Sequence, residues 1–438
     1  MTAHRLYLSV ALNSTGSAAR SWRAAGSKWN RFADWEHYLR SAQLAHEGVF
    51  DIVFVSDHPA LQRDNTSRPI HSFDPTVLFT AVAATVPDIG FLLTASTSYN
   101  SPYNLARRLA TLDHISGGRV IWNVVSSFNP DIAANFGAAP LPERAERYRR
   151  ADEFLRVVKD LWLSWDSPSG PAPDGPLWDG TTARRIDHHG EFFDVTGPLN
   201  VPIGPQGHPV ISQAGASDAG IDLAARHSDI VYASLLHKQS AFDYQSRLRE
   251  RALAHGRDPD DLRLIPGLTV ILGETREEAY RKHEALHGHR GEDGLIADFL
   301  ERNWAVDLDH RRIDPDKPLD PALFTWTEDQ KRPVGFVKSF AELAAAEPIT
   351  PRQLVRRVEG GHRLAVGTPR EVADTILDWW SSGAVAGFNI HIPVLPDGIE
   401  EFNRLVIPLL QESGAFPSAY DGSTIRERLK LPDPRNRP

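Results

Sequence analysis

The residues FLLTASTSYNSPYNLARRLATLDHISGGRVIWNVV, numbers 91–125, carry the pattern that decides the fold class. An apolar strand is predicted over Phe91–Thr94, an amphipathic helix over Asn104–Ile115 and a second strand over Arg119–Val125. Gly117-Gly118 separates helix from strand, where we expect a structural turn. Both strands are almost continuously apolar, which is typical of parallel strands covered by helices. The stretch therefore predicts one β–α–β unit of a parallel sheet.

The same alternation of strand and helix runs along the rest of the chain. About eight such units favour a (β/α)8 TIM barrel in a single domain over residues 1–438, although periodicity alone does not separate a barrel from a doubly wound sheet. The other predicted strands are Leu6–Leu12, Asp51–Val55, Val210–Gln213, Ile230–Ala233, Leu264–Leu272 and Gly387–Ile392. The other predicted helices are Trp35–His46, Thr76–Thr85, Arg144–Trp165, Asp218–His227, Gln239–His255, Arg276–His287 and Arg370–Ser381.

Two stretches interrupt this rhythm, at about 166–208 and 288–350. The first is rich in Pro, Gly and Asp, and the second mixes charge with Pro and Trp. Loops of this length in a compact domain are usually functional or poorly ordered, and in a barrel they can cover the mouth at the C-terminal ends of the strands. By composition, Trp304, Phe324, Trp326 and Phe336 are candidate lid residues, or they pack the insertion onto the barrel.

The overall composition narrows the function classes. The chain has 438 residues, 41% of them hydrophobic, a net charge of −9 and no cysteine. A negative chain is a poor partner for nucleic acid. Without cysteine there is no disulfide, thiolate nucleophile or Cys-ligated metal. No apolar run approaches a membrane span and no secretory signal is evident, so we expect a cytoplasmic protein.

A phosphate site is predicted where strand Val210–Gln213 runs into Gly215, Ala216 and Ser217 and then a helix. A glycine turn and a hydroxyl at a helix start offer backbone N–H groups to an anion. Ser217 could equally be an ordinary N-cap. The segment matches neither the hydrolase pattern G-x-S-x-G nor the dinucleotide pattern G-x-G-x-x-G.

Further polar candidates stand at the start of a helix and at predicted strand ends. Arg144 and Tyr148 are four residues apart and share a helix face, although Tyr148 could be a core residue and Arg144 a solvated charge. Asp57 follows an apolar strand, Thr94 ends one, and Asn123 lies inside one. A carboxylate or amide in such a place needs partners, which makes these residues site candidates; Asn123 could instead be a satisfied core amide.

One motif points to a different enzyme. His283-Glu284-Ala285-Leu286-His287 matches H-E-x-x-H, the zinc-protease pattern. The surrounding run is charged nearly all round, which is typical of a solvated outer helix, and Arg290 stands where the longer metzincin motif needs glycine. We therefore expect no metal site.

Several segments, in this order, resemble the bacterial-luciferase-like flavin monooxygenases. More narrowly, they resemble the subgroup with the nitrilotriacetate, EDTA, dibenzothiophene-sulfone and long-chain alkane monooxygenases. The resemblance covers essentially residues 1–431, and no single motif carries it. The segments are FDIVFVSDH (50–58), TASTSYNSPYNLARRLATLDHISGGRVIWNVVSSFN (94–129), ANFG (134–137), RYRRADEFL (147–155), HHGEFFDVTGPLNVP (188–202), PQGHPVISQAGAS (205–217) and TIRERLKL (424–431).

This resemblance implies a TIM barrel that receives reduced FMN (FMNH2) from a separate NAD(P)H:flavin reductase. It also implies a C4a-peroxyflavin formed with O2, one oxygen atom inserted into a small organic substrate, and a homodimer or homotetramer. By matching position, Asp57, Thr94 and Asn123 would surround the flavin ring. Tyr148 and Ser217, with the Gly215–Ser217 backbone, would hold the phosphate. No residue is assigned as the catalytic acid or base.

Two departures from the family pattern bear on catalysis. Several relatives carry His where this chain has Arg144, a change that preserves a phosphate contact and removes a proton-transfer role. The segment Gly16–Arg23 lacks a His that relatives show there. The alternatives are a deazaflavin-dependent oxidoreductase of the same superfamily, a non-catalytic flavin-binding protein and a zinc hydrolase.

Overall fold

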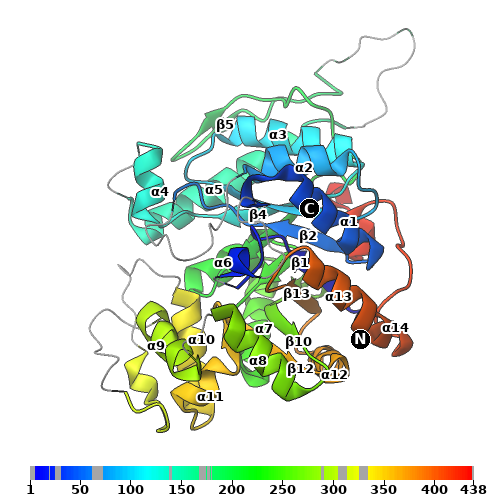
Figure 1. The fold of residues 1–438 in the computed structure, drawn as a ribbon. Coiled ribbons are helices and arrows are strands. Elements are labelled where there is room, and N and C mark those ends of the chain that lie inside the picture. The colour runs from blue at the N-terminus through cyan, green and yellow to red at the C-terminus, as the bar shows by residue number, and fades with distance from the viewer. Residues whose placement is uncertain are drawn as a thin grey trace.

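The computed structural model describes residues 5–18, 20–24, 31–61, 73–137, 141–166, 174, 178, 180–287, 291–303, 313–324 and 334–436. A curled, mostly parallel sheet forms its centre, and helices pack around it (Figure 1). Along the sheet, β1 (Tyr7–Ala11) is followed by β2 (Ile52–Val55), β3 (Gly90–Ser96), β4 (Val120–Val125), β7 (Val210–Ala214), β8 (Ile230–Tyr232) and β9 (Arg263–Leu264). On the other side of β1 lie β13 (Gly387–His391), β10 (Gly267–Leu272), β12 (His362–Gly367) and β11 (Val358–Glu359).

The segment that carries β9 and β10 closes this sheet into a barrel. β9 pairs with β8, while β10 pairs with β13, which in turn pairs with β1. Between them, Ile265 N donates to Val231 O at 2.9 Å, and Ala386 N donates to Leu264 O at 2.9 Å. With this segment counted once, eight parallel strands of the described chain form the ring, so the predicted (β/α)8 barrel is confirmed. The strand predicted over Leu264–Leu272 is two strands, because Pro266 has no N–H for the ladder.

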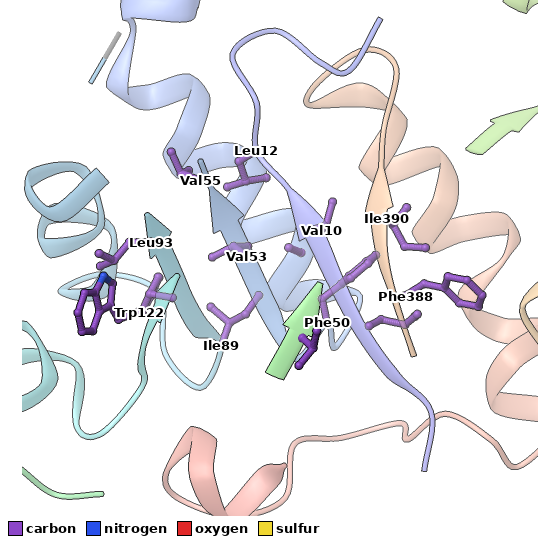
Figure 2. Close-up of a cluster of buried hydrophobic side chains, with 14 of the residues drawn as sticks. Val10, Leu12, Phe50, Val53, Val55, Ile89, Leu93, Trp122, Phe388 and Ile390 are labelled. Atoms are coloured by element: carbon purple, nitrogen blue, oxygen red, sulfur yellow. The ribbon is translucent and has the colours of Figure 1, made fainter. Parts of the chain in front are cut away.

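Helices cover the outside of the barrel with their apolar faces. Figure 2 shows outward side chains of neighbouring strands, among them Val10, Val53, Leu93 and Ile390, in one buried layer. Gly117, in the left-handed conformation at φ 69°, ends α3 as the predicted turn requires. The helices around the barrel are α1 (Trp35–Glu47), α2 (Pro75–Ala83), α3 (Pro102–Ser116), α4 (Pro130–Asn135), α5 (Arg144–Trp162), α6 (Asp218–His227), α7 (Lys238–Ala254), α8 (Arg276–His287), α12 (Pro369–Ser381), α13 (Asp397–Leu405) and α14 (Ile407–Glu412).

Inside the barrel, an apolar floor lies beneath a polar layer. Seven inward residues from successive strands form one buried cluster with Ile425 and Leu429 of the C-terminal segment, where α15 spans Ile425–Arg428. Two residues further along several of the same strands, the inward side chains are polar. The barrel is therefore sealed at one end and polar toward the C-terminal ends of its strands, where barrel enzymes place their sites. The floor residues are Tyr7, Ile52, Leu92, Ile121, Val210, Ile230 and Ile265; the polar residues above them include Ser9, Thr94, Asn123, Ser212, Tyr232 and Asn389.

The two insertions contain regular structure that the composition did not reveal. The first holds a short hairpin of β5 (His188–His189) and β6 (Asp194–Val195). In the second, α9 (Gly291–Asn303) and α10 (Val334–Ala346) join α11 (Pro351–Val355), which follows the insertion, in a lobe that is seen beside the barrel in Figure 1. This lobe has its own core, built around Phe340, Leu354 and Val358. β12 was not predicted, because its residues HRLAVG begin with two polar side chains.

Candidate active site

Thr94 and Asn123 lie side by side in the polar layer. They are register partners on β3 and β4, and Asn123 Nδ2 donates to Thr94 Oγ1 at 2.9 Å. Asn123 Oδ1 is buried and has no hydrogen-bond partner among the described residues. A buried acceptor without a partner is costly unless a ligand donor satisfies it. The pair is therefore suited to a ligand that carries an N–H group, such as the edge of a flavin ring.

Asp57 lies just after β2, at the same end of the barrel. Burial, reinforced by the nearby charge of Asp74, raises the pKa of the Asp57 carboxyl to about 6. Burial also lowers the pKa of its neighbour His58. A carboxyl held at a cost near the mouth of a barrel is a site candidate, because structural carboxylates are usually paired.

The loop after β7 forms a compact turn into α6. Gly215 is buried, and a Cβ there would lie 2.7 Å from both the Gln213 side chain and the Gly220 backbone, so only glycine fits. Tyr244 OH donates to the Gly215 carbonyl. Ser217 is the N-cap of α6, and its Oγ accepts from Gly220 N at 3.2 Å. The N-cap interpretation is therefore confirmed, and the N–H groups of the first turn of α6 remain suited to an anion.

Tyr148 reaches this loop from α5. Its hydroxyl is 3.4 Å from Ser217 Oγ, so the two residues that the resemblance assigns to the phosphate lie next to each other. Arg144 begins α5 one turn before Tyr148 and is half-buried. The pKa of Arg147 is lowered mainly by burial and, to a smaller extent, by the charge of Arg144. Arg147 was not predicted. Its Nη1 donates to Ser127 O at 3.1 Å, and its Nε is buried with no partner among the described residues, so Arg147 is a second cation at the start of α5, beside the loop after β4. The run RYRR was the sequence signal for it.

A histidine pair on the other side of the mouth was also not predicted. His362 of β12 stacks on His391 of β13, with ring centroids 4.3 Å apart, and Asn389 Nδ2 lies 3.1 Å from His391 Nε2. Burial lowers the pKa of His362 to about 4, and its Nδ1 has no partner in the described chain. Gly267 makes room for this ring, because a Cβ there would lie 2.3 Å from His362 Nδ1. No sequence signal was available, since two separate strands bring the rings together.

The second insertion covers part of the mouth through α10. A Cβ on Gly335 would lie 2.8 Å from the Ala216 side chain, and Ser339 Oγ donates to Ser234 O at the end of β8. Phe336 meets the His362 ring edge-on at 5.5 Å and also packs against the core of the insertion, so it stays a candidate lid residue. Phe324 instead packs in the core of the insertion. Trp304 and Trp326 lie outside the described residues.

The H-E-x-x-H helix differs from expectation. His283 is only 3% exposed, because α8 packs against β10 and β12 through Ala279, Ile271 and Leu364. The prediction of a solvated outer helix was wrong for this face: the charged residues that suggested it occupy the opposite side.

The predicted residues thus form two contacting pairs and several neighbours. Thr94 contacts Asn123, and Tyr148 lies next to Ser217. Gly215 and Ala216 adjoin Ser217, and β4 and β7, which carry the two groups, are neighbours in the sheet. The orphaned Asn123 acceptor and the glycine turn at a helix start fit the polar ring edge and the phosphate of a flavin mononucleotide.

A surface pocket borders Tyr148 from outside the barrel, between α5, α6 and the β5–β6 hairpin. Its charges pair with one another: Asp152 contacts His227 at 2.8 Å and Arg226 at 3.0 Å. The ring-site residues Thr94 and Asn123 do not line it. Among the described helices, none is both long and apolar enough to cross a bilayer.

Comparisons with known proteins agree with this geometry. The N-acetyl-S-(2-succino)cysteine monooxygenase of Bacillus subtilis is 36% identical, over 99% of this chain and 98% of its own. The nitrilotriacetate monooxygenase component A of Aminobacter aminovorans is also 36% identical, over 95% and 94%. The solved EDTA monooxygenase from Chelativorans sp. BNC1 superposes with a TM-score of 0.84 at 40% identity, covering 98% of this chain and 99% of that one.

A family model described as luciferase-like monooxygenase matches residues 12–386. The close homologues of this chain are flavin-dependent monooxygenases of two-component systems, in which a separate reductase serves the oxygenase. The chain therefore belongs to the luciferase-like monooxygenase family and is a flavin-dependent monooxygenase.

Proposed function

We propose that the chain is the oxygenase component that binds reduced FMN from a separate NAD(P)H:flavin reductase. It transfers one oxygen atom of O2 to a small organic substrate, while the other leaves as water and the flavin is oxidised. One observation carries this proposal. Asn123 Oδ1 on β4 has no partner among the described residues, and the neighbouring strand β7 leads into the N-terminus of α6, which suits a phosphate.

The phosphate would be held by the loop after β7. Gly215 and Ala216 let the backbone approach closely, and the first turn of α6 contributes N–H groups and its positive dipole end. Tyr148 and Ser217 add hydroxyl groups 3.4 Å apart. Arg144 supplies a positive charge at the start of α5.

The ring would lie over the polar layer of β3 and β4. Asn123 Oδ1 would accept from a ring N–H, while Thr94 fixes the amide orientation by accepting from Nδ2. Asp57 borders the same end of the barrel. Reduced FMN supplies the electrons that activate O2. The sealed apolar floor and the α10 cover limit access of water to the reacting centre.

The substrate would enter between the ring and the histidine pair. His362 is neutral at physiological pH, and with His391 and Phe336 it would offer the substrate an aromatic surface at the mouth. Small polycarboxylates that carry an amine or thioether are the first candidates, because the relatives named for N-acetyl-S-(2-succino)cysteine and EDTA are among the most similar proteins.

The test is a substrate screen with FMN, NADH and an excess of a flavin reductase, read by O2 uptake and product mass. A product one oxygen atom heavier, or its breakdown product, supports the proposal when 18O2 labels it. A deazaflavin oxidoreductase would transfer hydride without 18O, and a non-catalytic flavin binder would show only the uncoupled O2 uptake of free FMNH2. Either result across amines, thioethers, sulfones and alkanes overturns the proposal.

A further inference from the structure

Three metal-ligating side chains converge on one point outside the barrel mouth. His283 and His287 lie one turn apart on α8, and Glu359 lies on β11. The Nε2 atoms of both histidines are 3.0 Å from the same oxygen, Glu359 Oε2. The ligand atoms of all three residues lie within 4.8 Å of one another. Two imidazole nitrogens and a carboxylate oxygen thus surround a common centre.

These distances suit coordination of a zinc ion. Zinc binds His nitrogen at about 2.0–2.1 Å and carboxylate oxygen at about 2.0–2.2 Å, so two tetrahedral ligand atoms lie about 3.4 Å apart. The observed 3.0 Å is a few tenths of an ångström shorter, which a small side-chain rotation accommodates. Imidazole favours zinc and its transition-metal neighbours over magnesium or calcium.

The surroundings hold the three ligands in place. The side chains of His283, His287 and Glu359 are 3%, 14% and 13% exposed. Ala279 packs with Ile271 and Leu364 and holds α8 against the barrel beside the three ligands.

We propose that His283, His287 and Glu359 bind one divalent transition-metal ion, for which Zn2+ is the best fit, and that this ion fastens α8 to the β11–β12 hairpin. Three protein ligands leave a fourth position for water. Because the three ligand side chains are at most 14% exposed and the ion would join two elements of the fold, we assign it a structural role.

The position of the hairpin gives the site a consequence. Glu359 is followed by the Gly360-Gly361 turn and then by His362, which stacks on His391 at the barrel mouth. Ser234 Oγ donates to the Gly361 carbonyl. An ion at Glu359 would thus hold the strand that presents His362, at the base of the α9–α11 lobe.

The experiment measures metal content and affinity of the tag-free, full-length chain. After removal of metal with a chelator, Zn2+ is titrated in competition with a chromophoric chelator, and bound zinc is counted by mass spectrometry. One tight zinc per chain is expected, and Co2+ should give the visible absorption of a low-symmetry N/O site. Loss of a residue that only hydrogen-bonds to a metal ligand lowers metal affinity about 10–100-fold. Loss of a ligand itself, in His287→Gln or Glu359→Gln, should therefore lower zinc affinity more than about 100-fold.

The matched control is His189→Gln. His189 also pairs with a carboxylate, Asp194, at 2.9 Å, but on the exposed β5–β6 hairpin, so its loss should leave zinc affinity unchanged. Zinc should also raise the Tm of the wild type and not that of His287→Gln. No stoichiometric zinc on the wild type would overturn the proposal, as would equal affinity in wild type and His287→Gln. In either case the cluster is a metal-free ion pair.

Discussion

Replacing Asp57 by Asn tests whether this carboxyl serves function at the expense of stability. Its pKa rises from an ordinary value of 3.8 to about 6 in the fold. For a carboxyl whose folded pKa is raised, the folded state is penalised once the group ionises. The penalty is absent below the unfolded pKa, grows as pH rises from 3.8 toward 6, and is complete above 6. Asp57→Asn should therefore stabilise the protein at pH 8 and do so less at pH 5.

The magnitude follows from the same shift. Two pKa units correspond to about 3 kcal/mol, and partial exposure of Asp57 reduces this to about 1–2 kcal/mol. For 438 residues with an unfolding entropy of about 2 cal/mol/K each, the Tm should rise by about 1–2 °C. The gain at pH 5 should be about half as large, because the folded carboxyl is then mostly protonated.

The assay pairs differential scanning calorimetry at pH 5 and pH 8 with reductase-coupled turnover. Unchanged or higher stability at pH 8 with lower turnover is expected, and Asp57→Ala should show the same loss of turnover with a Tm within a few degrees of wild type. Asp74→Asn is the matched control: it removes the nearby charge, so the pKa of Asp57 should fall. A clear loss of stability in Asp57→Asn at pH 8 would refute the reasoning and make the carboxylate structural.

Three further predictions concern the flavin. In anaerobic titrations, Arg144→Ala should weaken the affinity for reduced FMN by about one to two powers of ten and leave the affinity for reduced riboflavin unchanged. The reason is that a hydrogen bond to a charged group contributes about 1.5–3 kcal/mol. The control is Arg149→Ala: Arg149 lies on the same helix as Arg144, is exposed and pairs with Glu191. If Arg144→Ala weakened the binding of FMN and riboflavin equally, the cause would be a packing defect. Asn123→Leu should weaken both reduced flavins by about 1–3 kcal/mol, because the ring N–H loses its acceptor; unchanged affinity would place the ring elsewhere. The purified chain alone should not oxidise NADH, since the sequence shows no nicotinamide-binding fingerprint; steady NADH oxidation without a reductase would contradict this.

The order of strands and helices follows from local patterns in the chain, whereas closure of the sheet into a barrel does not, because the same periodicity also fits a doubly wound sheet. The apolar runs at 91–94 and 119–125 and the helical stripe between them depend on neighbours a few residues away, so periodicity reveals them. The same holds for Asp57, Thr94 and Ser217, which stand at strand ends or a helix start, where a parallel barrel places its site. The interruption at Pro266 also has a local cause, although the strand prediction overlooked it.

Tertiary structure decided what depends on residues far apart in the chain. His362 and His391 become neighbours because β12 and β13 both pair with β10, and no spacing in the sequence encodes that contact. The apolar residues of the second insertion form a core together with Leu236, Leu354 and Val358, and this core depends on contacts between segments far apart in the chain. His283 and His287 share a helix face by sequence, but Glu359, 72 residues beyond His287, joins them only through the packing of α8 against the β11–β12 hairpin. Side-chain partners across such distances are set by how the elements pack, which local periodicity does not contain.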